Sequence, residues 1–214
     1  MSHFKHREHS PFFQDGARKY LDQAERQRFL KYAARAEIDI SLFCQVIAHT
    51  GCRISEALNL RPSHICIDRQ AIIFETLKQR GVKRFRQVPI PKSLLKALVT
   101  WIDLKPFSDA RLWPIHRQTG WRWVKKVMRK AKIIGDHATP RGLRHSFAVN
   151  ALWHAIPIVK VQKWLGHSKI DNTTIYTNVV GPEELCMAKR MWRSNSQLKI
   201  YNLRSMIPID RLAA

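Results

Sequence analysis

Acidic residues are scarce in this chain of 214 residues, which holds 16 Asp and Glu against 38 Lys and Arg and has a formal net charge of +22. A folded protein this basic repels itself and gains from an anionic partner. Lys and Arg release counterions when they contact phosphate, so the charge favours nucleic acid as that partner. A membrane surface is the rival, but the basic residues are spread along the chain rather than gathered on one amphipathic stretch. We therefore expect a protein that binds nucleic acid and has no membrane partner.

Cysteines and apolar runs are also few. None of the four cysteines forms a CxxC pair and their spacing fits no zinc pattern, which is typical of reduced thiols in the cytosol. No apolar run approaches the length of a membrane span, and the first ten residues lack the apolar region of a signal peptide. We therefore expect no metal site and a cytoplasmic location, with the nucleoid or plasmid DNA of a bacterium. The cysteines are Cys44, Cys52, Cys66 and Cys186.

Helical spacing begins after a basic start. Residues 1–18 are polar and basic, and we predict that they form a tail. A first helix is predicted from Asp22, which is a plausible N-cap. A second helix is predicted over 41–49, where Gly51 is well placed to end it, and a third over 53–60.

Residues 71–90 have the pattern of a β-hairpin. A short β-type run at 71–74 and an alternating run at 85–90 flank a predicted turn at 78–81. One face of the second strand is predicted to carry Arg86, Val88 and Ile90. The tip of the hairpin is strongly basic and carries Lys78, Arg80, Lys83 and Arg84.

The second half of the chain is predicted to be helical. Pro91 suits the first position of one helix, and another covers 119–131 with Trp121 on its inward face. The outward face of that helix is basic and carries Arg122, Lys125, Lys126, Arg129 and Lys130. Further helical patterns cover 140–154, 157–165, 171–180 and 182–194. The sequence therefore predicts a mainly α fold with a small antiparallel β-sheet.

Three segments carry side chains of the types that take part in catalysis. The first is Thr-Gly-Cys-Arg-Ile-Ser-Glu-Ala-Leu-Asn-Leu at 50–60, and the second is Thr-Pro-Arg-Gly-Leu-Arg-His-Ser-Phe-Ala at 139–148. The third is Trp-Leu-Gly-His-Ser at 164–168, followed by Thr-Thr-Ile-Tyr-Thr at 173–177. In this order and spacing, and together with the basic hairpin, they resemble the catalytic domain of tyrosine recombinases, the phage integrase family. The resemblance runs from about residue 20 to about residue 195 and implies the fold of those catalytic domains.

The resemblance implies cleavage of a DNA phosphodiester without a metal or any other cofactor. Arg53 and Arg144 match the family's two arginines, whose planar, permanently charged forks neutralise the phosphate in the transition state. Tyr176 matches the nucleophile, and its phosphotyrosyl ester would conserve the energy of the broken bond for religation. Glu56 matches the acidic position that orients Arg53 or a nearby basic group. His167 matches the basic position that hydrogen-bonds the scissile phosphate.

The proton chemistry matches the family less closely. In the family a lysine on the β-hairpin protonates the leaving 5′-oxygen; Lys78 is the best match and Lys83 is the alternative. The residue three before Arg144 is usually His or Lys, whereas this chain has Arg141. An arginine holds phosphate well but is a poor proton acceptor at neutral pH. Arg141 is therefore a candidate catalytic residue that acts by electrostatics, and another group would take the proton of the tyrosine.

Several of these residues also have a purely structural interpretation. Taken singly, the arginines could be surface residues, Tyr176 a core tyrosine with a satisfied hydroxyl, and Lys78 a residue of the turn. His145 is predicted to be a buried, hydrogen-bonding residue that braces its helix. The tryptophans predicted in the core or an interface are Trp101, Trp121, Trp123 and Trp164. The predicted DNA-binding residues are Arg80, Lys83, Arg84, Arg122, Lys125, Lys126 and Arg129.

The resemblance implies a site-specific DNA recombinase that forms a 3′-phosphotyrosyl intermediate, and we expect it to serve a mobile element, a plasmid, or a DNA inversion or integration system. Expected partners are double-stranded DNA, further copies of the chain in a homotetramer on paired sites, and a helper DNA-binding protein. Two alternatives stay open. One is a non-catalytic DNA-binding regulator of the same fold, which Arg141 favours. The other is an enzyme like a type IB topoisomerase, which relaxes DNA without choosing a site.

The expected domain organisation follows from the extent of the resemblance. Residues 1–18 would be the basic tail and residues 19–195 the catalytic domain. Residues 196–214 would be a C-terminal tail that either docks on a neighbouring protomer, as such segments do in the family, or packs on its own domain. We also expect the chain to lack the separate N-terminal helical domain that family members usually carry.

Overall fold

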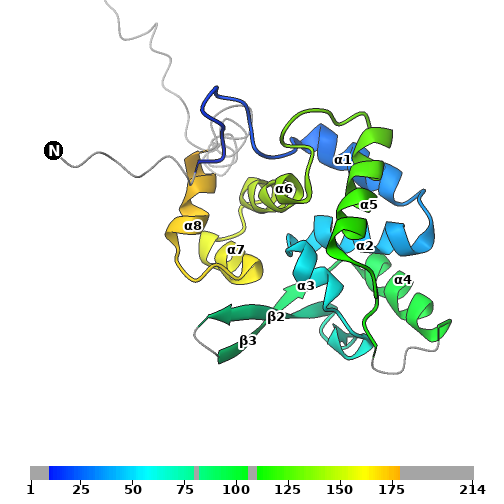
Figure 1. Ribbon diagram of the computed structural model, residues 1–214. Coiled ribbons are helices and arrows are strands. Elements are labelled where there is room, and N and C mark those ends of the chain that lie inside the picture. Colours follow the sequence, from blue (N-terminus) through cyan, green and yellow to red (C-terminus); the bar gives the residue numbers. More distant parts are fainter. Residues whose placement is uncertain (1–9, 80–81, 106–109, 179–214) are drawn as a thin grey trace, which may run out of the picture. The chain divides into compact units, whose positions relative to one another are not determined.

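A computed structural model describes residues 10–79, 82–105 and 110–178, except for the side chains at 76–79, 82–83 and 178. The chain divides into two units, 1–179 and 180–214, and every described residue lies in the first. Helices make up most of this unit, and a small antiparallel sheet completes it (Figure 1). The predicted fold class, mainly α with a small antiparallel β-sheet, is confirmed.

The longer helices are α1 (Gln23–Ala33), α2 (Ile38–Thr50), α4 (Lys92–Asp103), α5 (Arg117–Lys130), α6 (Pro140–Trp153) and α7 (Ile158–Leu165). The short helices are α3 (Ile54–Leu58), α8 (Asp171–Thr174) and the 3₁₀ turns η2 (Pro62–His64) and η3 (Ile175–Asn178).

Helix α2 is the centre of the hydrophobic core. It contacts α1, α3, α4, α5 and α6, and its side chains from Leu42 to Ala48 are buried except Gln45. A helix that is apolar around most of its circumference has to be covered on several sides, and here the other helices cover it. The core therefore fixes the position of α6, which carries the second chemistry-bearing segment.

Two predicted helix ends are confirmed. The Asp22 side chain accepts a hydrogen bond from the backbone of Glu25, and the Glu25 side chain accepts one from the backbone of Asp22, so α1 starts with a capping box. Gly51 ends α2 in the left-handed conformation, with φ of 63°. A side chain at Gly51 would also overlap the ring of Phe147, so this turn brings α2 very close to α6.

The sheet has the order β1–β2–β3, with β1 (Ile65–Cys66), β2 (Ala71–Gln79) and β3 (Val82–Pro89) all antiparallel. Strand β1 was not predicted, because its two residues are too few to show an alternating pattern. The prediction that Lys78 lies in the turn is wrong, because β2 continues through a β-bulge after Thr76 and pairs again at Gln79. The predicted face of β3 is confirmed: Arg86, Val88 and Ile90 are all buried.

Other elements differ from the predictions in their ends. Pro91 is the N-cap of α4 rather than its first residue, and the segment predicted as one helix over 171–180 is divided into α8 and η3. Trp121 was predicted to face the core, which is wrong, because 43% of its surface is exposed. Trp101 is buried and stacks on Trp113, with ring centroids 5.5 Å apart. The predicted helix at 182–194 lies outside the described residues.

Candidate active site

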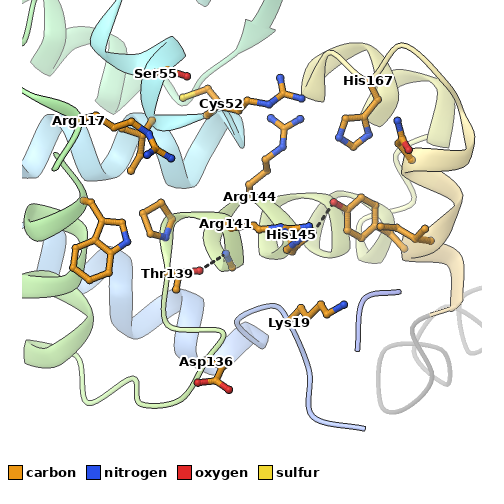
Figure 2. Close-up of a pocket in the computed structure, with 18 of the residues that line it drawn as sticks. Lys19, Cys52, Ser55, Arg117, Asp136, Thr139, Arg141, Arg144, His145 and His167 are labelled. Atoms are coloured by element: carbon orange, nitrogen blue, oxygen red, sulfur yellow. Dashed lines mark hydrogen bonds between the residues drawn. The ribbon is translucent and has the colours of Figure 1, made fainter. Parts of the chain in front are cut away.

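A cavity of about 740 Å³ brings together most of the predicted catalytic residues. It is bordered by the start of α3, the first half of α6, the turn after α7 and the 3₁₀ turn η3 (Figure 2). The predicted site residues that line it are Arg53, Arg141, Arg144, His167 and Tyr176. Glu56 does not line the cavity but contacts Arg53. The backbone of Lys78 lies in β2, and its side chain is outside the described residues, so its predicted role stays a prediction.

Arg144 is held rigidly at the back of the cavity. Only 7% of it is exposed, and its two terminal nitrogens donate to the carbonyl oxygens of Gly51 at 2.7 Å and Leu165 at 2.8 Å. Burial, and then the nearby charge of Arg53, lower the pKa of Arg144 to about 10, so the guanidinium stays charged at neutral pH. Because Gly51 ends α2 and Leu165 ends α7, these two helix ends set the direction of the guanidinium.

Arg53 precedes the first turn of α3 and is oriented by Glu56. One carboxylate oxygen of Glu56 accepts from the Arg53 backbone N–H at 2.7 Å, and the other accepts from the Arg53 guanidinium at 3.0 Å. The Arg53 side chain remains 40% exposed and faces the cavity. The predicted contact between Glu56 and Arg53 is therefore present.

Arg86 is a positioning residue that was predicted to share one face of its strand with Val88 and Ile90 but was given no role. It comes from β3, and its guanidinium donates to both oxygens of Glu56, at 3.0 and 2.7 Å. The Glu56 side chain is 0% exposed and that of Arg86 is 4% exposed, so this ion pair is fully buried. Burial alone would raise the pKa of Glu56, but the hydrogen bonds and charge of Arg86 hold it below its ordinary value. The signal in the sequence was an arginine in phase with buried Val88, since a buried arginine requires a carboxylate partner.

The turn that carries His167 is built on the same network. Arg86 Nε donates to the Trp164 carbonyl oxygen at 2.8 Å, close to the end of α7. Gly166 then takes the left-handed conformation, with φ of 69°, and directs the chain to His167. The His167 ring contacts the Thr173 hydroxyl at 2.9 Å. Burial, and then the charges of Arg144 and Arg53, lower the pKa of His167 to about 3, so the ring is neutral at physiological pH.

Tyr176 lies on η3 with its hydroxyl directed toward α6. It is 3% exposed, and its oxygen lies 2.7 Å from Nδ1 of His145, a hydrogen bond that Figure 2 marks at the His145 ring. Burial raises the pKa of Tyr176 to about 12, although the charges of Arg144, Arg141 and Arg53 oppose this shift. The prediction that His145 is buried and hydrogen-bonded is confirmed; its partners are Arg141, on the same helix, and Tyr176, on η3.

The predicted DNA-binding residues differ in their exposure to solvent and in their contacts. Arg84, Arg122 and Arg129 are exposed, on β3 and α5. Lys126 forms an exposed ion pair with Glu37 at 3.4 Å. Lys125 is half-buried, because its ammonium group donates to the Ala138 carbonyl oxygen at 2.8 Å and lies 5.8 Å from the Trp121 ring centroid. Arg80 and the side chain of Lys83 lie outside the described residues.

Helix α5 also contributes two residues to the cavity that were not predicted there. Arg117, at the start of α5, and Trp121, one turn further on, both line the cavity, and Arg117 lies on the side away from His167 (Figure 2). Arg117 had no motif to indicate it, and Trp121 was misplaced because its apolar spacing resembled that of core residues. Together they extend the basic and aromatic lining beyond the predicted catalytic residues.

Metal binding finds no support in the described ranges. Within residues 10–79, 82–105 and 110–178, no group of three or more His, Cys, Asp or Glu side chains could hold a metal ion. In the same part of the chain, Cys44, Cys52 and Cys66 are free thiols. None of the helices described there is long and apolar enough to cross a bilayer.

Comparison with known proteins identifies the family. The sequence model of the phage integrase family matches residues 19–181. The chain belongs to the phage integrase family. A tyrosine recombinase of Thermosipho africanus is 31% identical over 151 residues, which is 68% of this chain and 52% of that protein. The tyrosine recombinase XerA of Pyrococcus furiosus is 30% identical over 170 residues, 75% of this chain and 57% of that protein. The chain therefore spans between half and three fifths of the length of these curated relatives.

Solved structures of the family have the same fold. The crystal structure of XerA recombinase has a TM-score of 0.70 and 26% identity, and the match covers 80% of this chain and 64% of that one. The catalytic domain of bacteriophage HP1 integrase has a TM-score of 0.57 and 26% identity, and the match covers 80% of this chain and 93% of that domain. The part of the chain that the structure describes therefore has the fold of a phage integrase catalytic domain.

Proposed function

We propose that this chain carries the catalytic domain of a site-specific tyrosine recombinase, which cuts and rejoins double-stranded DNA through a 3′-phosphotyrosyl intermediate. The observation that carries the proposal is the convergence of Arg53, Arg144, His167 and Tyr176 on one cavity, from three separate segments of the sequence. The names of the relatives support it, since the curated relatives compared above are called tyrosine recombinases. The volume of the cavity, about 740 Å³, is large enough to admit a phosphate with its adjoining sugars.

In the proposed reaction, Tyr176 gives its phenolic proton to water, its oxygen attacks the scissile phosphorus, and the bond from phosphorus to the 5′-oxygen breaks. Arg53 and Arg144 bind the non-bridging oxygens, where negative charge develops. His167, which is neutral, donates a hydrogen bond to the same phosphate. Lys78 gives the leaving 5′-oxygen its proton, with Lys83 as the alternative donor. The 5′-hydroxyl of a partner strand then gives its proton to the same lysine and attacks the phosphorus of the phosphotyrosyl ester. The bond to the Tyr176 oxygen breaks, and Tyr176 regains a proton from water.

The electrostatics of the site suit this chemistry. Arg144 is fixed by two carbonyl oxygens before any substrate arrives, so it does not have to reorganise during the reaction. The Glu56 carboxylate offsets part of the positive charge of Arg53 and Arg86. It therefore reduces the repulsion between these two arginines and Arg144 at the phosphate site. Arg141 acts in this proposal as a fixed positive charge, since a guanidinium does not accept a proton at neutral pH.

The proposed partner is double-stranded DNA, in keeping with the net charge of +22. Arg84 on β3 and the basic residues of α5 would contact its phosphates, together with Arg80 and Lys83 of the hairpin. We include in the proposal a homotetramer on paired sites, a helper DNA-binding protein, and service to a mobile element, a plasmid, or an inversion or integration system. The proposed location is the bacterial nucleoid or a plasmid.

Covalent trapping tests the proposal. The protein and its Tyr176→Phe variant are incubated with a nicked duplex that carries the candidate recombination site from the flanking DNA, and adducts that resist SDS are resolved on a gel. We expect an adduct with the unaltered protein alone. Tight binding with no adduct would favour the non-catalytic regulator instead. Relaxation of a supercoiled plasmid by a monomer, without recombination, would favour an enzyme like a type IB topoisomerase.

A further inference from the structure

The contact between Tyr176 and His145 has a defined direction, because of the residue on the other side of the imidazole. Arg141 Nε lies 3.3 Å from His145 Nε2, in hydrogen-bonding geometry. A guanidinium N–H can only donate, so Nε2 of His145 must present its lone pair. A neutral imidazole carries one hydrogen, which must then be on Nδ1. Nδ1 is the nitrogen that lies 2.7 Å from the Tyr176 oxygen.

The doubly protonated form of His145 is excluded by its surroundings. The ring is only 7% exposed, and Arg141 and Arg144 of its own helix and Lys19 of the N-terminal segment face it with positive charge. Burial, and then these three charges, lower the pKa of His145 to about 3. His167, in the turn after α7, is also near enough to interact with it electrostatically. At physiological pH the ring is therefore neutral, with its single hydrogen on Nδ1.

We propose that His145 is a positioning residue for the nucleophile, and that Arg141 holds it in the tautomer that donates Nδ1–H to the Tyr176 oxygen. This inference rests on the proposed function of Tyr176 as nucleophile. The hydrogen bond holds the phenolic oxygen in place and stabilises negative charge on it as its proton leaves. His145 is consequently not the base that takes this proton, because the nitrogen that faces Tyr176 already carries a hydrogen. The Tyr176 hydrogen is directed away from His145, since its oxygen uses a lone pair to accept that bond.

The proposal gives Arg141 a role that accounts for its difference from the family pattern. A histidine at that position could either donate to the Nε2 of His145 or accept from it, so it would not fix the tautomer. Arginine can only donate, and it does so at every pH at which the protein is folded. Lysine at the same position would also be a permanent donor, whereas methionine would fill similar space without a donor.

Nitrogen NMR of the imidazoles tests the tautomer without any DNA. The full chain is labelled with ¹⁵N-histidine, and the His145 signals are assigned by their loss in His145→Asn. We expect a protonated Nδ1 and an unprotonated Nε2 in the unaltered protein and in Arg141→Lys, and a shift toward the Nε2–H tautomer in Arg141→Met. An Nε2–H tautomer in the unaltered protein, or no change in Arg141→Met, would overturn the proposal.

Cleavage kinetics test the consequence for Tyr176. The amide nitrogen of Asn is close to where Nδ1 of His lies, so His145→Asn keeps a donor to the Tyr176 oxygen and His145→Ala removes it. We expect single-turnover adduct formation to slow by about 10²-fold in His145→Ala, as for loss of one donor to a developing anion, and to be at least tenfold faster in His145→Asn. Equal rates in the two variants would contradict the proposal. If the unaltered protein forms no adduct, the proposed function fails, while the NMR result still decides the tautomer.

Discussion

Glu56→Gln should lower the stability of the protein far more than its small change in shape suggests. The Glu56 side chain is completely buried, and its two oxygens accept four hydrogen bonds, two from Arg86 and two from Arg53. An amide nitrogen in place of either oxygen would face two N–H donors. Each orientation of the new amide therefore loses two charge-assisted hydrogen bonds and leaves the buried Arg86 guanidinium without its counter-charge.

The expected magnitude follows from those contacts. Hydrogen bonds to charged groups contribute about 1.5–3 kcal/mol each, and removing one partner of a buried ion pair costs about 3–5 kcal/mol. We expect Glu56→Gln to lower the free energy of unfolding by about 3–5 kcal/mol. For a chain of this length, this loss corresponds to a fall in Tm of about 6–20 °C.

Urea unfolding at neutral pH measures this loss, and Asp39→Asn is the matched control. Asp39 forms a 2.7 Å ion pair with Lys105, but both side chains are about two fifths exposed, at 42% and 40%. Such a pair contributes about 0–1 kcal/mol. If Glu56→Gln cost no more than Asp39→Asn, the reasoning about the buried network would be refuted.

The pH dependence provides a second check on the same network. The folded-state pKa of Glu56 is below its ordinary value, so its contribution to stability is fully present above the pKa of the unfolded chain, near pH 4. The contribution is lost as pH falls through the lower, folded-state pKa. The difference in stability between the unaltered protein and Glu56→Gln should therefore shrink below about pH 4. A constant difference down to the acid transition would show that Glu56 is not held ionised.

Three further predictions concern α6 and α5. Thr139→Ala should lower the free energy of unfolding by about 1 kcal/mol, because the Thr139 hydroxyl caps α6 by accepting a hydrogen bond from the Gly142 N–H at 3.0 Å. Thr139→Ser keeps a hydroxyl and should keep this stability, so equal stability of the Ala and Ser variants would contradict the prediction. Gly142→Ala should destabilise the protein by about 1–3 kcal/mol in urea unfolding, because a Cβ there would overlap the His137 carbonyl oxygen. An unchanged unfolding midpoint would show that the backbone at His137 moves aside at no cost. If Arg122 contacts a phosphate, Arg122→Gln should weaken DNA binding and reduce the slope of log affinity against log salt concentration by about one. Fluorescence anisotropy with duplex DNA measures the affinity at each salt concentration. An unchanged slope would show that Arg122 is not part of the DNA interface.

The sequence was sufficient for the fold class and for much of the site because both depend on local patterns. Asp22 and Gly51 mark helix ends through their own backbone and side-chain chemistry, so they could be identified without any tertiary information. Arg53, Arg144, His167 and Tyr176 were found because each belongs to a short segment of characteristic composition. Their convergence on one cavity required the structure.

The contacts that escaped prediction link distant parts of the chain. Arg86 and Glu56 lie on different elements, and neither residue shows in sequence which carboxylate or guanidinium it meets. The role of His145 depends on Arg141 on one side and Tyr176 on the other, of which only Arg141 is on the same helix. Trp121 was misplaced because apolar spacing on a helix does not distinguish a core from a cavity wall.

The most direct test of the central claim is to locate the bond between the protein and DNA. The trapped adduct is digested with trypsin, and the DNA-linked peptide is identified by mass spectrometry. Cleavage after Lys169 and Lys189 gives a peptide in which Tyr176 is the single tyrosine. We predict that this peptide carries the 3′-phosphate of the broken strand, and that Tyr176→Phe gives no adduct. A phosphate linked to any other residue, or no adduct from unaltered protein that binds the same DNA tightly, would contradict the account.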